Sequence, residues 1–387
     1  MDVHHVLHHG KHRRRRRRRV LLVGLCMLAL AAGIGTALAR NGGPDPSDAG
    51  RAAGPTSPAA TGHGDHGDHG SPAPSPAPPP QSAATVGPGT AVAVGKAPHD
   101  VAVSPDGSFA YIADPGAGAV IRFDPARSTT TATIAVPEAP PQMVTFSPDG
   151  SRAFVSAFTD GFAVDVVAIL DTGTGTEIAA VPVGRGPYAA AVTPDGRRLF
   201  VPYYDEDHLD VLDTGSGALV TRIPLPPSPH WVSFSHDGRF AYITDHFSDV
   251  VTVLDVQTYD VVASIPVGEG PHSLEVSPDG TRVAVADYVG GDVTVIDPAR
   301  NVVVGTVPAV GAGPQDVTYA PDGRHFYTAD VDDGTMAVVD ADSGAVTARV
   351  PVGDSPTSVA VTPDGRRVLV TVFGEGTVRV LEGAAGS

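Results

Sequence analysis

Two histidines of the chain have the residue type and the spacing that a chemical site requires. His230 and His272 lie 42 residues apart, and each directly follows a proline. A neutral imidazole acts as a general base near neutral pH, and it is also a common ligand of zinc. Asp287 follows His272 by 15 residues and offers a carboxylate to an imidazole or a cation. His230, His272 and Asp287 are therefore the first candidates for catalytic residues.

A repeated motif must position these side chains. The turn Pro-Asp-Gly, once written His-Asp-Gly, recurs at intervals of 42–46 residues, with its aspartates at Asp106, Asp149, Asp195, Asp237, Asp279, Asp322 and Asp364. Each unit holds four short runs in which apolar residues alternate, as strands with one packed face do. A period in the forties with four strands is typical of a β-propeller blade. We therefore expect an all-β, seven-bladed β-propeller of four-stranded blades over residues 89–387.

The last unit is one strand short. Only the runs RRVLVTV and TVRVLE follow its turn, whereas residues 90–94, ahead of the first unit, match the outer-strand ending of the other units. We expect this N-terminal strand to complete the last blade and close the ring, because closure removes a free sheet edge.

Strand directions bring two positions of each blade to one mouth of the central channel. These are the residue after the proline and the end of the second strand. The expected ligand-binding residues of the mouth are His99, Gln142, Tyr188, His230, His272, Gln315, Asp114, Asp245 and Asp330. They predict an acidic, histidine-bearing mouth that binds a small molecule or a protein.

The residues leave three interpretations of this mouth open. The polar positions are a repeat consensus that caps backbone groups, or they hold a divalent metal, or they catalyse a reaction. Magnesium or calcium would use Asp245, Asp287 and Asp330, whereas zinc would use His230 and His272. No cofactor follows from the sequence beyond this possible divalent metal.

The unit G-x-x-P-x-x-V-A-V-S-P-D-G, followed by YIAD-like and VxVID-like strands, resembles the YVTN-type propeller repeat from about Thr90 to the C-terminus. That resemblance implies a seven-bladed propeller outside the cytoplasm with no single known ligand. The pair of histidines also resembles streptogramin B lyase, a seven-bladed propeller with a magnesium ion, in which a histidine is the base in a ring-opening elimination of a lactone. That resemblance implies His272 or His230 as the base and Asp287 as the carboxylate.

The region ahead of the repeats predicts export. Residues 1–19 contain seven consecutive arginines, and residues 20–39 form an uncharged apolar run long enough to span a bilayer. This order keeps the N-terminus cytoplasmic and places the propeller on the extracytoplasmic side of the membrane. The run serves as a single-pass anchor, or as a signal peptide cut after Ala39 that leaves the protein secreted. Residues 40–88 read as a disordered Pro/Gly/Ala/Ser linker, in which His63, His66 and His69 form a weak metal-binding motif.

Charge limits the partners of the propeller. Residues 89–387 carry 16 basic and 38 acidic side chains, so they repel a phosphate backbone, and we expect no nucleic acid. The sequence predicts a monomeric, extracytoplasmic scaffold that binds a ligand or a protein through its mouth, rather than an enzyme. The alternative is a metal-dependent lyase or lactonase that acts on a cyclic ester.

Overall fold

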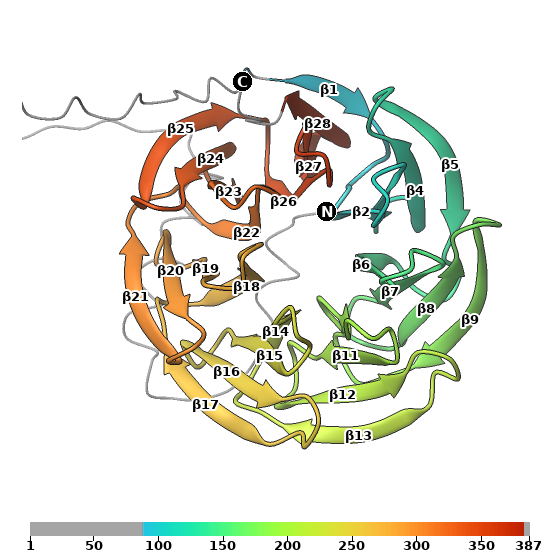
Figure 1. The fold of residues 1–387 in the computed structure, drawn as a ribbon. Helices are drawn as coiled ribbons and strands as arrows, with labels where there is room; N and C mark the ends of the chain where they lie inside the picture. Colours follow the sequence, from blue (N-terminus) through green and yellow to red (C-terminus); the bar gives the residue numbers. More distant parts are fainter. Residues whose placement is uncertain (1–86, 88, 383–387) are drawn as a thin grey trace, which may run out of the picture. The chain divides into compact units, whose positions relative to one another are not determined.

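The computed structural model describes residues 87 and 89–382, which form seven four-stranded antiparallel sheets arranged as a ring (Figure 1). This confirms the predicted all-β, seven-bladed propeller with four-stranded blades. The predicted basic region, the apolar run 20–39 and the linker 40–88 lie outside the described residues, apart from residue 87. Within the described residues, no helix has the length and apolar character needed to cross a membrane.

Each blade runs from an inner strand next to the axis to an outer strand at the rim. Blades 1 to 4 consist of β2 (Asp100–Val103), β3 (Ala110–Asp114), β4 (Ala119–Asp124) and β5 (Thr129–Ala135); β6 (Pro141–Phe146), β7 (Arg152–Phe158), β8 (Asp165–Asp171) and β9 (Thr176–Pro182); β10 (Ala191–Val192), β11 (Arg198–Pro202), β12 (His208–Asp213) and β13 (Leu219–Pro224); and β14 (Pro229–Phe234), β15 (Phe240–Asp245), β16 (Val250–Asp255) and β17 (Val261–Pro266).

The remaining blades follow the same order. Blades 5 to 7 consist of β18 (Pro271–Val276), β19 (Val283–Asp287), β20 (Asp292–Asp297) and β21 (Val302–Val307); β22 (Pro314–Tyr319), β23 (His325–Asp330), β24 (Thr335–Asp340) and β25 (Ala345–Pro351); and β26 (Pro356–Val361), β27 (Arg367–Val372), β28 (Thr377–Glu382) and β1 (Thr90–Ala93). A short 3-10 helix, η2 (Phe373–Glu375), lies between β27 and β28.

The last blade takes its outer strand from the beginning of the described chain. Strand β1 pairs antiparallel with β28, with Thr90 opposite Val380 and Ala93 opposite Thr377. Two distant parts of the sequence therefore share one sheet, which leaves no gap between the first and the last blade (Figure 1).

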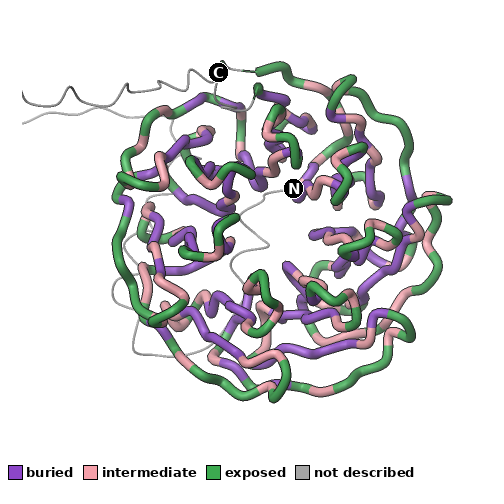
Figure 2. The backbone as a smooth tube through the Cα atoms, viewed as in Figure 1, coloured by how far each residue is buried: buried purple, intermediate pink, exposed green. Residues whose placement is uncertain are grey.

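The core lies between neighbouring blades. Tyr111 and Val120 of blade 1 pack with Val144 and Val155 of blade 2, and equivalent clusters fill the spaces between the other blades. The two middle strands of each blade are buried, whereas the outer strands are largely exposed (Figure 2). Each blade thus buries both faces of its middle strands and depends on its two neighbours for stability.

The Pro-Asp-Gly turns join the inner strand to the second strand on one face of the ring, here called the turn face. In blade 5 the hydroxyl of Ser277 donates to Oδ1 of Asp279 at 2.6 Å, and Gly280 has a φ of 71°. A positive φ favours glycine at this position, and proline fixes φ at the start of the turn. The opposite face, where the chain crosses from one blade to the next, is here called the mouth face.

Candidate functional site at the mouth of the propeller

In five of the seven blades, a β-bulge places the residue after the proline at the mouth. In blades 4 and 5, the pairing of the inner strand shifts between Pro229 and Trp231 and between Pro271 and Ser273, so His230 and His272 have no direct partner on the second strand. The same shift leaves out Gln142, Gln315 and Thr357. A bulge redirects the side chain of its extra residue, so the repeat aims one side chain per blade toward the axis.

His230 and His272, on the adjacent blades 4 and 5, lie against each other. Their ring centroids are 4.4 Å apart, and Tyr188 of blade 3 packs on His230 at 4.3 Å and near His272 at 5.7 Å. Tyr188 reaches them because the inner strand of its blade departs from the regular pattern. The backbone N–H of Ala189 donates to the carbonyl of His230, so the segment ahead of β10 pairs with β14 of blade 4.

Both imidazoles are buried, and neither has a hydrogen-bond partner. His230 is 4% exposed and His272 is 1% exposed, and none of their four ring nitrogens makes a hydrogen bond in the described part of the protein. Burial, followed by the repulsion of neighbouring imidazoles, lowers the pKa of each ring well below its usual range. At His272 an interaction with the backbone of Gln315, outside hydrogen-bond geometry, opposes this shift. Both rings are therefore neutral at pH 7, and each keeps one nitrogen able to accept a proton.

His99 fills the same position in blade 1 but is partnered. Its Nδ1 donates to the carbonyl oxygen of Gln142 at 3.0 Å, and its Nε2 lies 3.5 Å from the side-chain amide nitrogen of Gln315. Burial lowers the pKa of His99, and the bond to Gln142 opposes this shift. Blades 4 and 5 thus differ from blade 1, where the histidine at this position makes a hydrogen bond of ordinary length.

The aspartates at the ends of the second strands turn away from the imidazoles. Asp114 accepts backbone N–H groups from Lys96 and Ala97 at 2.7 and 3.0 Å, and Asp287 accepts the Thr294 hydroxyl at 2.6 Å. No hydrogen bond joins Asp287 to His272 within residues 87 and 89–382. The structure therefore does not bring the predicted catalytic carboxylate to the predicted base.

Asp245, Asp287 and Asp330 also remain separate from one another. Each interacts with threonines of its own blade, and burial raises the pKa to about 8 for Asp245 and to about 7 for Asp287 and Asp330. Among the described residues, no three His, Cys, Asp or Glu side chains are arranged to hold a metal ion. The predicted trio does not fit a divalent cation, and His230 with His272 offers two ligands of the four that zinc usually takes. His63, His66 and His69 lie outside the described residues.

The residues that follow the strand-end positions form a collar around the imidazoles. Ring centroids of Tyr204 and His246 lie 5.8 and 5.2 Å from His230, and Tyr288 lies 5.9 Å from His272. The collar was not predicted as a site from the sequence. A signal was present, because neighbouring residues at the end of a strand point to opposite sides. If Asp245 points into its blade, His246 points toward the axis.

A second polar network lies on the inner strands. The hydroxyl of Ser358 lies 2.9 Å from Oδ1 of Asp100 and 3.0 Å from Oδ2 of Asp316, so one hydroxyl connects three blades. Asp100 and Asp316 also accept backbone N–H groups from Val144 and Val359 of the following blades. Burial raises the pKa of Asp100 to about 6 and that of Asp316 to about 7. These bonds fasten neighbouring inner strands to each other.

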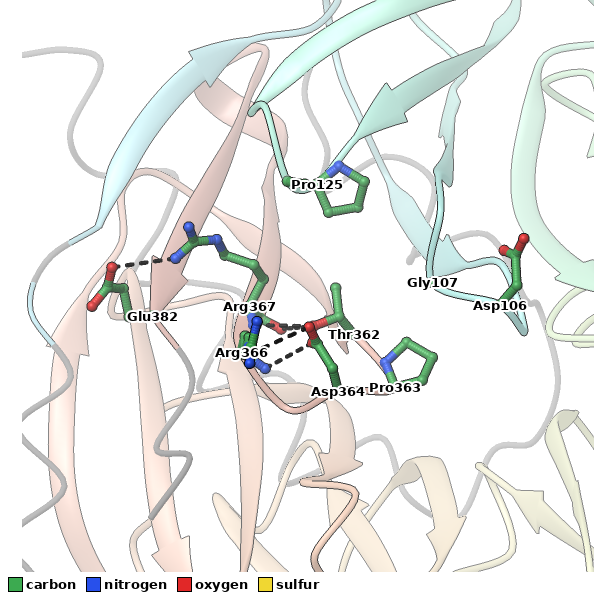
Figure 3. A pocket seen from close by; sticks show the side chains of 10 residues that line it. Asp106, Gly107, Pro125, Thr362, Pro363, Asp364, Arg366, Arg367 and Glu382 are labelled. Carbon is green, nitrogen blue, oxygen red and sulfur yellow. Dashed lines mark hydrogen bonds and ion pairs between the residues drawn. The ribbon is translucent and has the colours of Figure 1, made fainter. Parts of the chain in front are cut away.

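A cavity of about 450 Å³ lies far from this chemistry, on the turn face between blades 1 and 7 (Figure 3). Its charged side chains pair with one another. Arg366 lies 3.9 Å from Asp364, and Arg367 lies 3.3 Å from Glu382. The cavity therefore presents satisfied surface groups, whereas the mouth presents buried groups without partners.

Comparisons with known proteins agree with this fold. Hydrazine synthase of Kuenenia stuttgartiensis is similar in structure, with a TM-score of 0.69 and 22% identity over 76% of this chain and 97% of that chain. Among the curated proteins, none matches the chain. A family model described as "Lactonase, 7-bladed beta-propeller" matches residues 75–307, more than half of the chain. By this match, the chain belongs to the lactonase family of seven-bladed β-propellers.

Proposed function

We propose that the protein opens a cyclic ester at the mouth of its propeller. The observation that carries the proposal is the pair of buried, neutral imidazoles, His230 and His272, whose ring nitrogens lack partners. An unpartnered buried polar group destabilises a fold, so its presence at a mouth is better explained by a ligand than by packing. Membership of a family described as lactonases supplies the substrate class.

The chemistry follows from the state of the imidazoles. One imidazole accepts a proton from a water molecule, and the water oxygen bonds to the ester carbonyl carbon. The ring C–O bond then breaks, and the imidazolium returns its proton to the leaving alkoxide, which yields a hydroxy acid. A general base contributes about 10²- to 10⁴-fold to such a rate. The same neutral imidazole supports elimination, the reaction that the resemblance to streptogramin B lyase implies.

Other residues of the mouth take supporting roles in this proposal. Tyr188 contacts both imidazoles and holds their rings in place, and burial keeps its phenol protonated by raising its pKa. Asp287 is assigned no role, because its carboxyl group interacts with Thr294. No step is assigned to a metal, since the described side chains offer no three-ligand group.

Ligand binding without turnover is the second candidate. The observation that favours it is the burial of the imidazoles behind Tyr204, His246 and Tyr288, because a substrate reaches them only if this collar moves. In this alternative the mouth is a binding surface of a YVTN-type scaffold for a small molecule or a protein.

We also propose that the propeller acts outside the cytoplasm. The support is the arginine run followed by the apolar residues 20–39, with the linker 40–88 as a stalk. The acidic charge of the propeller argues against nucleic acid as a partner.

Ring opening by the full chain tests the proposed activity. A panel of γ- and δ-lactones is followed by the acid released, for wild type, His230→Ala and His272→Ala. We expect at least about a hundredfold loss of kcat in one or both variants. The matched control is His236→Ala on the turn face, where the ring is exposed and bonds the Ser277 carbonyl. Activity equal to wild type in both mouth variants would overturn the proposal, and a lactone that binds without being opened would support the scaffold.

A further inference from the structure

The loops of the mouth face carry a strong excess of negative charge. Between the strand ends that reach this face, the sequence places eleven acidic and two basic residues. The acidic residues are Glu138, Asp160, Asp205, Glu206, Asp207, Asp249, Glu269, Asp332, Asp333, Asp354 and Glu375. A cleft lined by one sign of charge repels ligands of the same sign and raises the local concentration of the opposite one.

The two basic residues do not offset this charge at the imidazoles. Arg185 is paired with Asp205 at 3.0 Å, and its guanidinium lies 5.0 Å above the ring of Phe162. Lys96 is exposed on the crossover into blade 1, whereas His230 and His272 belong to blades 4 and 5. Within residues 89–382, a phosphate or carboxylate on a ligand therefore meets no free guanidinium beside the histidines, although such groups are normally held by arginine forks.

A continuous aromatic wall leads to His230 from the loop after β7. The ring centroids of Phe162 and Tyr204 are 5.5 Å apart, and Tyr204 lies 5.9 Å from Tyr188 and 5.8 Å from His230. Phe158 supports Phe162 from behind at 5.7 Å. Such a wall offers stacking and apolar contact to a planar group, and it offers little to a polyhydroxylated ring.

We propose that the substrate is a lactone without anionic groups, bearing a planar apolar substituent that lies against Phe162 and Tyr204. This inference rests on the proposed function and adds its selectivity. The acidic face excludes phosphorylated and carboxylated lactones, and it accepts neutral and cationic ones. Asp205 acts as a specificity determinant, because it neutralises the arginine nearest the aromatic wall.

Three lactones that share one aryl-substituted ring test the charge selectivity. One is neutral, one carries a carboxylate, and one carries a quaternary ammonium group, and kcat/KM is measured with the full chain. At low salt we expect the neutral and cationic lactones to exceed the anionic one by roughly tenfold or more, and we expect high salt to reduce the gap. Equal kcat/KM for the anionic and neutral lactones at low salt would overturn this inference while the proposed function stands. If no lactone is opened, the proposed function itself fails.

Two variants assign the selectivity to residues. Asp205→Asn releases Arg185 and is expected to raise kcat/KM for the anionic lactone several-fold. The control Asp342→Asn makes the same charge change on the turn face and is expected to leave kcat/KM for the anionic lactone unaltered. Phe162→Leu removes the ring but keeps an apolar side chain at the same positive φ of 57°. We expect it to lower kcat/KM for the aryl lactone several-fold and to spare a lactone with a short alkyl group. An equal loss with both lactones would overturn the role of the aromatic wall.

Discussion

The turn face repeats one arrangement in six of the seven blades, with a Ser or Thr hydroxyl 2.6 Å from the aspartate of each turn. These aspartates are exposed, and their bonds lower the pKa, to about 2 in Asp149 and Asp279. On the mouth face, burial raises the pKa of Asp245 to about 8 and leaves its Oδ1 without a partner. The same repeat thus holds aspartates in opposite states at its two ends.

This difference assigns folding stability to the turn-face end of a blade and function to its mouth-face end. The turn face is the same in nearly every blade and the aspartates of its turns are hydrogen-bonded, so these turns can serve folding in each repeat. The mouth face differs from blade to blade and contains buried polar groups without partners. Proteins keep such groups at sites where function compensates for lost stability.

The largest expected effect concerns Asp245, the aspartate of the mouth face whose pKa is raised by burial. The folded protein keeps the proton of Asp245 to about pH 8, whereas the unfolded chain releases it near pH 3.8, so wild type loses stability as the pH rises between these values. Asp245→Asn cannot ionise. We expect it to gain on the order of 3 kcal/mol in free energy of unfolding, relative to wild type, between pH 4 and pH 8. Urea unfolding at several pH values measures the change.

The matched turn-face variant is Asp279→Asn, for which the sign is reversed. The folded-state pKa of Asp279 is depressed to about 2, so its contribution to stability is present above pH 3.8 and is lost as the pH falls toward 2. Asp279→Asn should therefore destabilise slightly above pH 4.

The Asp245 prediction has a clear contrary outcome. If the free energy of unfolding changed with pH in the same way in wild type and in Asp245→Asn, Asp245 would be ionised in the folded protein, as a bound cation would require.

The fold followed from the sequence because the turn signals have a local cause. Proline, aspartate and glycine fix the backbone of each turn by themselves, and their spacing gives the number of blades. The residue after each proline could also be assigned to the mouth, and the structure brings His99, Tyr188, His230 and His272 together there.

The direction of the strand-end side chains could not be obtained from spacing alone. Asp287 was expected to face His272, but its carboxyl group lies against Gly268 of the crossover, which has no side chain to displace it. The network of Asp100, Ser358 and Asp316 was also missed, because it joins two consecutive blades to blade 1 across the closure of the ring. Contacts between blades depend on the bulges and on side-chain rotamers, which a repeat pattern does not encode.

A smaller effect tests the imidazoles themselves. The folded-state pKa of His272 is lowered, so the unfolded chain binds a proton below about pH 6.5 while the folded protein does not, and wild type loses stability as the pH falls. In His272→Phe we expect the free energy of unfolding to gain roughly 1–2 kcal/mol relative to wild type between pH 7 and pH 5. Thermal or urea unfolding across this range measures it.

His236→Phe is the control for that measurement, since it makes the same change at an exposed histidine of the turn face. It measures how the loss of an exposed imidazole from the turn face changes the free energy of unfolding between pH 7 and pH 5. If the free energy of unfolding depended on pH in His272→Phe as it does in wild type, the buried imidazole would bind a proton as readily in the folded protein as in the unfolded chain. That result would contradict a neutral His272 at the mouth.

The smallest effect concerns the one turn that departs from the others. Blade 6 has Ala320 where the other blades have Ser or Thr, so no hydroxyl bonds Asp322 there. Ser277→Ala in blade 5 removes a hydroxyl that donates to Asp279 at 2.6 Å and accepts the Arg282 N–H at 3.0 Å. We expect this change to cost about 1 kcal/mol in free energy of unfolding, and Ala320→Ser to gain about 0.5 kcal/mol. If Ala320→Ser destabilised the fold while Ser277→Ala cost the expected amount, the turn of blade 6 would not accept the hydroxyl-to-aspartate bond of the other six turns. The turn face would then differ in that blade by more than one missing hydroxyl.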